Sequence, residues 1–194
     1  LRYDPELTSD EFAEQAVLCA LDAAKPSFAN HRRYSADFEA LGLGRYAIAS
    51  CYNGLPVGGG SLTLVRLNLA ALVAEGGPAH GMADAEAFLA GPLAAAVDAT
   101  ASYIDERVRF LLEESGFFES SFLVREGLVA KERFTAMFGL VGLAECVDAL
   151  LAARGLRFGR DAEADELGLG ILRSIEKDVA ARKNPLLAAA GGRY

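Results

Sequence analysis

The chain has 194 residues, and its 19 Lys and Arg against 27 Asp and Glu give a formal net charge of −8. Nucleic-acid affinity comes largely from clustered Lys and Arg, so this charge argues against nucleic acid, and also against an anionic membrane surface, as a partner. Hydrophobic residues make up 52% of the chain and charged residues 24%, a composition far from that of disordered chains. We expect a single folded domain over residues 1–194.

No segment of the sequence has the pattern of a membrane span or a signal peptide. The apolar runs at residues 62–74 and 134–144 are too interrupted or too short, since a span takes about 20 apolar residues. We therefore expect a cytoplasmic protein. The three cysteines, Cys19, Cys51 and Cys146, are widely spaced and form no CxxC pair, so they predict neither a disulfide framework nor a metal site.

The first third of the chain predicts one helix followed by two strands. A capping box at Thr8 begins a helix over about residues 9–24, in which apolar residues lie near one face. Residues 46–50 read as a short strand, and residues 61–67 alternate as a second strand does. Between them, four glycines and a proline predict that residues 53–60 form a loop.

The rest of the chain predicts helices with one further strand. Helical segments that separate strands favour parallel pairing, so the pattern indicates a helix-rich α/β fold. Three or four strands are too few to close a barrel, so either the sheet is small or the rest lies outside this chain. The remaining elements are a helix at 69–75 capped by Asn68, a helix at 84–114 kinked at Gly91 and Pro92, a strand at 121–125, and helices at 131–153 and 162–183.

Cys51 is the residue whose position points most directly to chemistry. It follows an apolar strand and begins a loop too rich in glycine to form its own core, and residues that carry function are often placed on such loops. The alternative is a small buried hydrophobic residue, as most free cysteines are. A thiol hydrolase would need a base, for which His31 is the better of the two histidines. The glycine run matches neither a phosphate loop nor a dinucleotide fingerprint.

Four stretches taken together carry a family resemblance. They are AKPSFAN at residues 24–30, the Cys51 loop, GGGSLTLVRLNL at 58–69, and ERFTAMFGLVGLAE at 132–145. In this order they resemble glycyl radical enzymes, most closely those of the YjjI type. A more distant similarity is to anaerobic class III ribonucleotide reductases, which carry Gly-Leu-Asn-Glu where this chain has Gly-Leu-Ala-Glu at 142–145.

The resemblance implies a fold and an activity. The chain would be the half of a ten-stranded α/β barrel that carries the cysteine finger loop. A glycyl radical would take hydrogen from Cys51, and the resulting thiyl radical would abstract hydrogen from a small-molecule substrate under anaerobic conditions. The residues expected to bind substrate are Asn30, His31, Tyr52, Asn53, Arg66 and Glu145. The resemblance also implies a radical-SAM activating enzyme as partner, and a homodimer is an open option.

The family's radical glycine has no counterpart here, since residues 191–194 read Gly-Gly-Arg-Tyr, in the wrong order for that segment. The chain also begins with Leu1. We therefore expect an internal part of a larger enzyme, inert alone, with no bound cofactor and with the glycyl radical on a segment outside this chain.

Several of these residues have structural alternatives. Arg66 fits a buried ion pair as well as a substrate anion, and Glu145 fits a helix brace. Cys19 and Cys146 lie in helical patterns and are expected in the core. The rival for the whole chain is a non-catalytic helix-rich interaction or scaffold domain with Cys51 buried, and a weaker one is a Cys/His thiol enzyme using His31.

Overall fold

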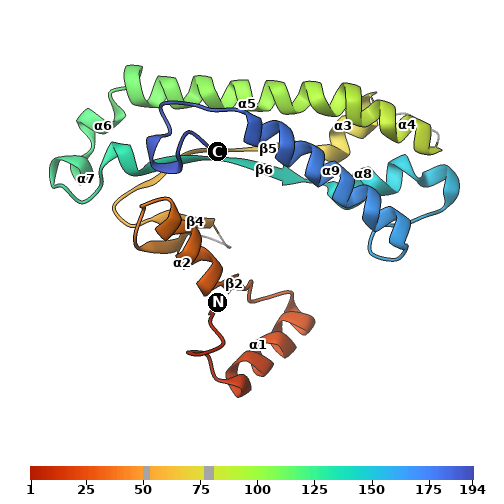
Figure 1. Cartoon of the computed structure of the whole chain (residues 1–194), viewed down its shortest axis with the longest axis horizontal. Helices are drawn as coiled ribbons and strands as arrows, with labels where there is room; N and C mark the ends of the chain where they lie inside the picture. The colour runs from red at the N-terminus through yellow and green to blue at the C-terminus, as the bar shows by residue number, and fades with distance from the viewer. Residues whose placement is uncertain (50–52, 77–80) are drawn as a thin grey trace. The chain divides into compact units, whose positions relative to one another are not determined.

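The computed structural model describes residues 1–49, 53–76 and 81–194 and divides the chain into two compact units (Figure 1). Unit 1 comprises residues 1–61, 118–135 and 188–191, and unit 2 comprises residues 62–117, 136–187 and 192–194. Each unit is described by itself below. That they form the single domain expected from the sequence stays a prediction.

Unit 1 begins with β1 (Arg2–Tyr3), helix α1 (Asp10–Ala23) and β2 (Ala29–Asn30), in this order along the chain. The strands β1 and β2 pair in parallel. The predicted helix is confirmed, but its cap is Ser9, whose Oγ accepts from the Phe12 amide at 3.4 Å. The apolar face of this helix is not buried: α1 has no buried residue and leaves Leu21 79% exposed. Periodicity identifies an apolar face, but it does not say that another element covers it.

Helix α2 (His31–Ala40) and the antiparallel pair of β3 (Tyr46–Ala49) and β4 (Asn53–Pro56) follow. The strand predicted at 46–50 is confirmed over residues 46–49, and residue 50 lies outside the described residues. The loop predicted at 53–60 is wrong for residues 53–56. The physical reason lies at Gly54, where an added Cβ would stand 2.5 Å from the Tyr34 ring. The missing side chain lets α2 pack directly on the strand. Phe38, Leu43 and Tyr46 form the small buried cluster of this unit.

The second segment of unit 1 contains short helical turns. The strand predicted at 121–125 is wrong: the residues form the helical turn α7 (Phe122–Arg125), after α6 (Phe117–Ser120). A short apolar run has no periodicity long enough to separate a strand from a helix, and here Gly127, with φ of +67°, ends the turn. The 3-10 turns η3 (Lys131–Arg133) and η5 (Ala188–Ala190) also belong to this unit.

The main strands of unit 2 are β5 (Gly60–Asn68) and β6 (Phe134–Val141), which pair with each other. The first two residues of each strand belong to unit 1. The strand predicted at 61–67 is confirmed, but the helix predicted at 131–153 is wrong over 134–141. Gly139 lies beside Leu64 and Arg66, and Gly142 beside Asn68, so contacts advance in the same direction along both strands and the pair is parallel. β6 then leads into α8 (Leu143–Leu150) through Gly142.

Apart from α8, the helices of unit 2 lie close to the predicted boundaries. Asn68 caps α3 (Leu69–Gly76) by accepting from the Ala71 amide at 3.1 Å, as predicted. The predicted kink is a π-helical turn, η1 (Leu89–Leu93), which contains Pro92. The other helical elements are α4 (Gly81–Phe88), α5 (Ala94–Arg109), the π-helical turn η2 (Phe110–Glu114), the 3-10 turn η4 (Ala152–Arg154) and α9 (Ala162–Ala181).

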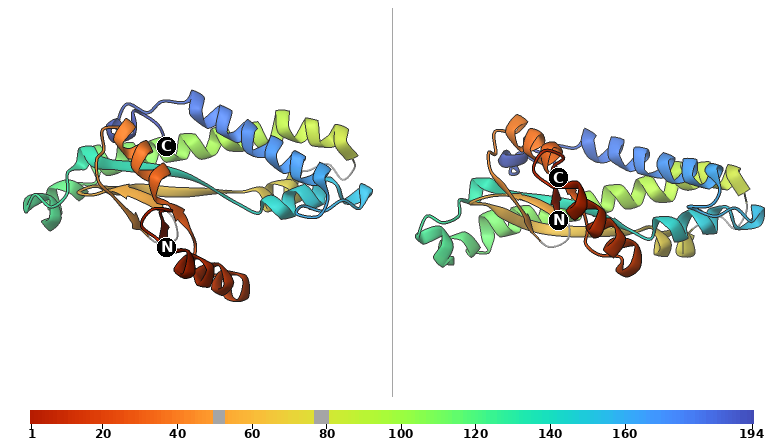
Figure 2. Two further views of the ribbon diagram at one scale, coloured as in Figure 1. Left: turned by 60° about the horizontal axis from the view of Figure 1, so that its bottom comes forward. Right: turned by 90° about the horizontal axis from the view of Figure 1, so that it is seen from below.

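The helical run Ala85–Glu114 is long and apolar enough to cross a membrane by length and composition, with a mean hydropathy of 1.3 in its best window. That test alone is weak, because the core helix of a soluble protein passes it too. In unit 2 the run carries a buried stripe, and α5 lies against α9 in both views of the unit (Figures 1 and 2). The buried residues of α5 are Val97, Ala101, Ile104 and Val108.

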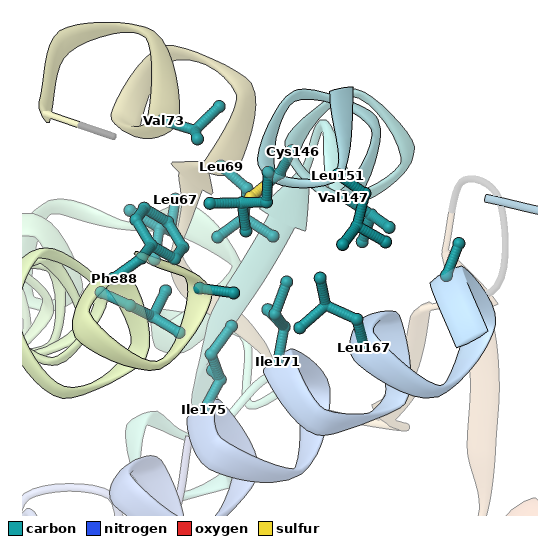
Figure 3. Packing of buried hydrophobic residues seen from close by; sticks show 14 of the residues in the cluster. Leu67, Leu69, Val73, Phe88, Cys146, Val147, Leu151, Leu167, Ile171 and Ile175 are labelled. Atoms are coloured by element: carbon teal, nitrogen blue, oxygen red, sulfur yellow. The ribbon is translucent and has the colours of Figure 1, made fainter. Parts of the chain in front are cut away.

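The larger core of the chain lies within unit 2, where α3, α4, α8 and α9 meet the end of β5 (Figure 3). Leu69, Val147 and Ile171 are each fully buried in it, one from each of three helices. A second cluster, with Ile104 and Ala136 buried, packs α5 against β6. Unit 2 therefore has a continuous apolar interior built from residues far apart in the sequence.

Candidate active site

The β3–β4 pair brackets the predicted catalytic cysteine. Tyr46 pairs with Pro56 at one end of the ladder, and Ala49 pairs with Asn53 at the other. Cys51 and Tyr52 themselves lie outside the described residues. The last residue of β3 and the first residue of β4, which flank positions 50–52 in the sequence, are therefore directly paired.

Arg133 binds the opposite end of this ladder. Its Nε donates to the Val57 carbonyl at 3.1 Å, just after β4, and its guanidinium also donates to the Leu43 carbonyl at 2.5 Å, shortly before β3. The Val57 amide in turn donates to the Arg45 carbonyl at 2.9 Å. One side chain thus joins the segments that enter and leave the hairpin, and we define Arg133 with Leu43 and Val57 as the Arg133 clamp.

The backbone of Arg133 lies so close to residue 59 that this position must be glycine. An added Cβ there would stand 2.1 Å from the Arg133 carbonyl oxygen, and no side chain fits against backbone at that distance. The sequence indicated a glycine-rich loop but not Arg133. The clamp joins residues 76 and 90 positions apart, so no local pattern marks the arginine.

His31 is held at the clamp end of the ladder. Its Nδ1 lies 2.6 Å from the Tyr46 hydroxyl and 3.4 Å from Ser35 Oγ. Three strand steps, about 10 Å, separate Tyr46 from Ala49. This arrangement ties the histidine to the end of the ladder where Tyr46 pairs with Pro56. The Cys/His thiol enzyme stays an alternative, because Cys51 lies outside the described residues.

Asn30 and Asn53, the other described candidates of unit 1, have structural positions. Asn30 is the N-cap of α2, and its Oδ1 accepts from the Arg33 amide at 3.0 Å. Asn53 is the first residue of β4 and is half-buried. The structure therefore brings Asn30 and His31 together at the start of α2 and places Asn53 at the cysteine end of the ladder.

Arg66 and Glu145 belong to unit 2 and lie near one edge of the β5–β6 pair. Arg66 is exposed near the end of β5, so the alternative of a buried ion pair is wrong, and it forms no ion pair with a described residue. Glu145 is exposed in the first turn of α8, where an acidic side chain suits the helix dipole. The carboxyl edge of parallel strands is a common position for ligand sites.

The two described cysteines differ in their surroundings. Cys146 is fully buried in the core, as predicted, and burial raises the pKa of its thiol to about 11. Cys19 was expected in the core, and that expectation is wrong: Cys19 is exposed on α1, a helix without a fully buried residue. Within residues 1–49, 53–76 and 81–194, no group of three or more His, Cys, Asp or Glu could hold a metal ion.

Parallel strands that lead into helices, with a cysteine between two paired strand ends, define a mixed α/β chain with a candidate thiol site. A family model described as "Glycyl radical enzyme YjjI-like" matches residues 1–194. The chain belongs to this YjjI-like glycyl radical enzyme family, and the predicted resemblance is confirmed.

Two curated relatives match this chain. It is 39% identical over 197 residues to an uncharacterized protein of Haemophilus influenzae, which covers 100% of this chain and 36% of that protein. It is also 39% identical over 180 residues to the "Uncharacterized protein YjjI" of Escherichia coli, with 92% of this chain and 33% of that protein covered. The chain therefore spans about a third of the length of these relatives.

Proposed function

We propose that this chain carries the thiyl cysteine of a glycyl radical enzyme, and that Cys51 abstracts hydrogen from a small-molecule substrate. Membership of the YjjI-like family supports the class of chemistry. The observation that supports the assignment to Cys51 is the pairing of Ala49 with Asn53, the strand residues that flank positions 50–52 in the sequence. The Arg133 clamp fastens the other end of the same ladder.

The radical glycine, expected on a segment outside this chain, supplies the unpaired electron. The S–H bond of Cys51 breaks as its hydrogen atom passes to the glycine Cα. The sulfur then takes a hydrogen atom from a substrate C–H bond, which re-forms S–H and leaves the unpaired electron on the substrate carbon. After rearrangement, the product carbon takes the hydrogen atom back, and the sulfur recovers its own from the glycine. No general base is needed, consistent with His31 being held at the clamp end of the ladder.

The proposal includes a barrel formed only with further strands. β5 and β6 are parallel and each leads directly into a helix, as the strands of α/β barrels do. The sheets of the described residues are two-stranded and none is closed. The proposal as a whole also includes half of a ten-stranded barrel, a radical-SAM activating partner, anaerobic operation and a cytoplasmic location.

The test compares Cys51→Ala with the natural full-length protein after anaerobic activation. We expect the variant to keep the doublet of the glycyl radical in electron paramagnetic resonance, because the radical resides elsewhere, and to lose turnover. Cys146→Ala is the control, since that thiol lies in an apolar core, and it should keep both the doublet and the turnover. Turnover retained by Cys51→Ala would remove the thiyl assignment.

A second candidate, a non-catalytic interaction module, has one observation in its favour. Helix α1 exposes apolar side chains that no described residue of unit 1 covers, including Phe12 at 54%, Leu18 at 51% and Leu21 at 79%. An exposed apolar face of this kind is typical of a docking surface. This candidate predicts neither a radical doublet nor any effect of Cys51→Ala on chemistry.

A further inference from the structure

Unit 1 contains a cavity of about 460 Å³ that the proposed radical chemistry does not use. Its volume lies within the usual range for small-ligand sites, roughly 300–1,000 Å³. It is formed where β1, one face of α2 along its length, and the segment that leads into β3 meet. The lining residues are Arg2, His31, Ser35, Glu39, Gly44, Arg45 and Tyr46.

The charges of this cavity favour an anion. Arg2 and Arg45 contribute two guanidinium groups against the single carboxylate of Glu39, so the lining is positive in a chain whose net charge is −8. Neither arginine side chain forms an ion pair with a residue that the structure describes, whereas Arg32 and Arg33 nearby in sequence do. A guanidinium without an internal partner retains its capacity to bind a carboxylate or phosphate through two hydrogen bonds.

His31 adds a ring N–H donor to the same cavity. The Tyr46 hydroxyl lies 2.6 Å from Nδ1, and Ser35 Oγ lies 3.4 Å from it. When the Tyr46 hydroxyl donates to Nδ1, the neutral ring carries its proton on Nε2, which then offers an N–H to a ligand oxygen. Nε2 has no hydrogen-bond partner among the residues described. Stacking of Tyr46 on Tyr34, with ring centroids 5.3 Å apart, holds the tyrosine that orients the histidine.

We propose that this cavity binds the carboxylate or phosphate group of a small organic anion. Arg2 and Arg45 supply the charge, and the His31 ring supplies a directed N–H donor. Glu39 disfavours excess negative charge and accepts a hydrogen bond from a hydroxyl on the body of the ligand. The inference goes beyond the proposed radical function, because binding here requires neither Cys51 nor a radical.

The experiment is calorimetric titration of the full-length, unactivated protein with inorganic phosphate and, separately, with acetate at constant ionic strength. Saturable binding of either anion supports the site, and the anion that binds more tightly gives the chemical class. Arg45→Gln should weaken that binding about tenfold or more, since a charge-assisted pair is lost. Arg125→Gln is the matched control, because Arg125 is an exposed arginine of unit 1 outside the cavity, and it should leave binding unchanged.

Glu39→Gln should change the affinity for the anion in the opposite direction from Arg45→Gln. Removing this carboxylate should tighten anion binding about threefold or more, because a like charge is removed from the lining. A residue with only a structural role would not produce this gain. The proposal is overturned if neither anion binds saturably, if Arg45→Gln and Arg125→Gln behave alike, or if Glu39→Gln weakens binding. Since no turnover is measured, failure here is distinct from failure of the Cys51 assignment.

Discussion

Cys146 shows how a single residue takes its chemistry from its surroundings. It comes from the first half of α8, and its side chain lies in the apolar cluster with Leu69 and Val147 (Figure 3). The apolar interior disfavours the thiolate, which raises the pKa of Cys146 from its ordinary value of 9.0 to about 11. A protonated, buried thiol is a poor nucleophile, so Cys146 acts as a core residue.

We predict that iodoacetamide at pH 8 modifies Cys19 in the folded protein and leaves Cys146 unmodified. Cys19 is exposed on α1, whereas Cys146 is buried and about one thiol in a thousand is ionised at that pH. Peptide mass spectrometry measures both sites, and a sample unfolded in guanidinium, in which both should react, is the control. Equal labelling of the two cysteines in the folded protein would contradict this burial.

The same pKa shift has a consequence for stability. Because the folded-state pKa is raised, the contribution of Cys146 is fully present below pH 9.0 and is lost as the pH rises toward about 11. Cys146→Ala should remove this part of the alkaline decline in the free energy of unfolding.

At the level of elements, β5 with α3 and β6 with α8 form two similar strand–helix units side by side. Each strand ends at a residue that begins a helix: Asn68 caps α3 through its side chain, and Gly142, with φ of +82°, turns the chain into α8. An added Cβ at Gly142 would stand 2.7 Å from the Ala70 Cβ, so the close approach of α3 and α8 also requires glycine there. The Gly-Leu-Ala-Glu segment therefore has a structural role at this turn.

The Arg133 clamp gives a prediction for the hairpin next to Cys51. Arg133→Ala removes both hydrogen bonds to the Leu43 and Val57 carbonyls and should lower the stability of unit 1 by about 1–3 kcal/mol. Amides of β3 and β4 should then exchange hydrogen for deuterium faster, as measured by mass spectrometry. Arg133→Lys should give an intermediate effect, because an ammonium group does not reproduce the planar fork of guanidinium.

Arg125→Ala is the control for the clamp, since Arg125 is an exposed residue of the same unit outside the clamp. It should leave exchange in β3 and β4 unchanged. If Arg133→Ala behaves like Arg125→Ala, the clamp does not hold the hairpin.

At the scale of the whole molecule, the two units differ in the size of their apolar cores. Unit 2 contains the larger apolar interior, with contributions from α3, α4, α5, α8, α9 and β5, whereas the buried cluster described in unit 1 consists of Phe38, Leu43 and Tyr46. Burial of apolar surface is the main favourable term in folding. We therefore expect substitutions inside unit 2 to dominate the measured stability.

Two positions on α9 test this expectation. Ile171 is fully buried and Leu169 is 41% exposed. Ile171→Ala should lower the free energy of unfolding by about 2–5 kcal/mol, because it leaves a cavity in the core. Leu169→Ala should change it by about 0.5 kcal/mol or less. Chemical denaturation measures both, and equal losses would mean that the unit 2 core is not packed as described.

Features with local causes were predictable from the sequence. The kinked run with its buried stripe, the Asn68 cap, the strand at 61–67 and the boundaries of α9 all follow from periodicity, capping and glycine or proline within a few residues. The order of motifs along the chain also identified the family, since that order is a property of the sequence.

Other features depended on contacts between distant residues. The apolar run at 134–141 has helical spacing, yet it forms a strand because β5 offers a parallel partner and Gly139 lets the two backbones approach. Asn53–Pro56 is a strand because Tyr34 packs on Gly54, and Arg133 reaches carbonyls far away in sequence. Hydrogen bonds within a helix are local and leave a periodic pattern, whereas strand pairing and side-chain clamps join distant residues and leave none.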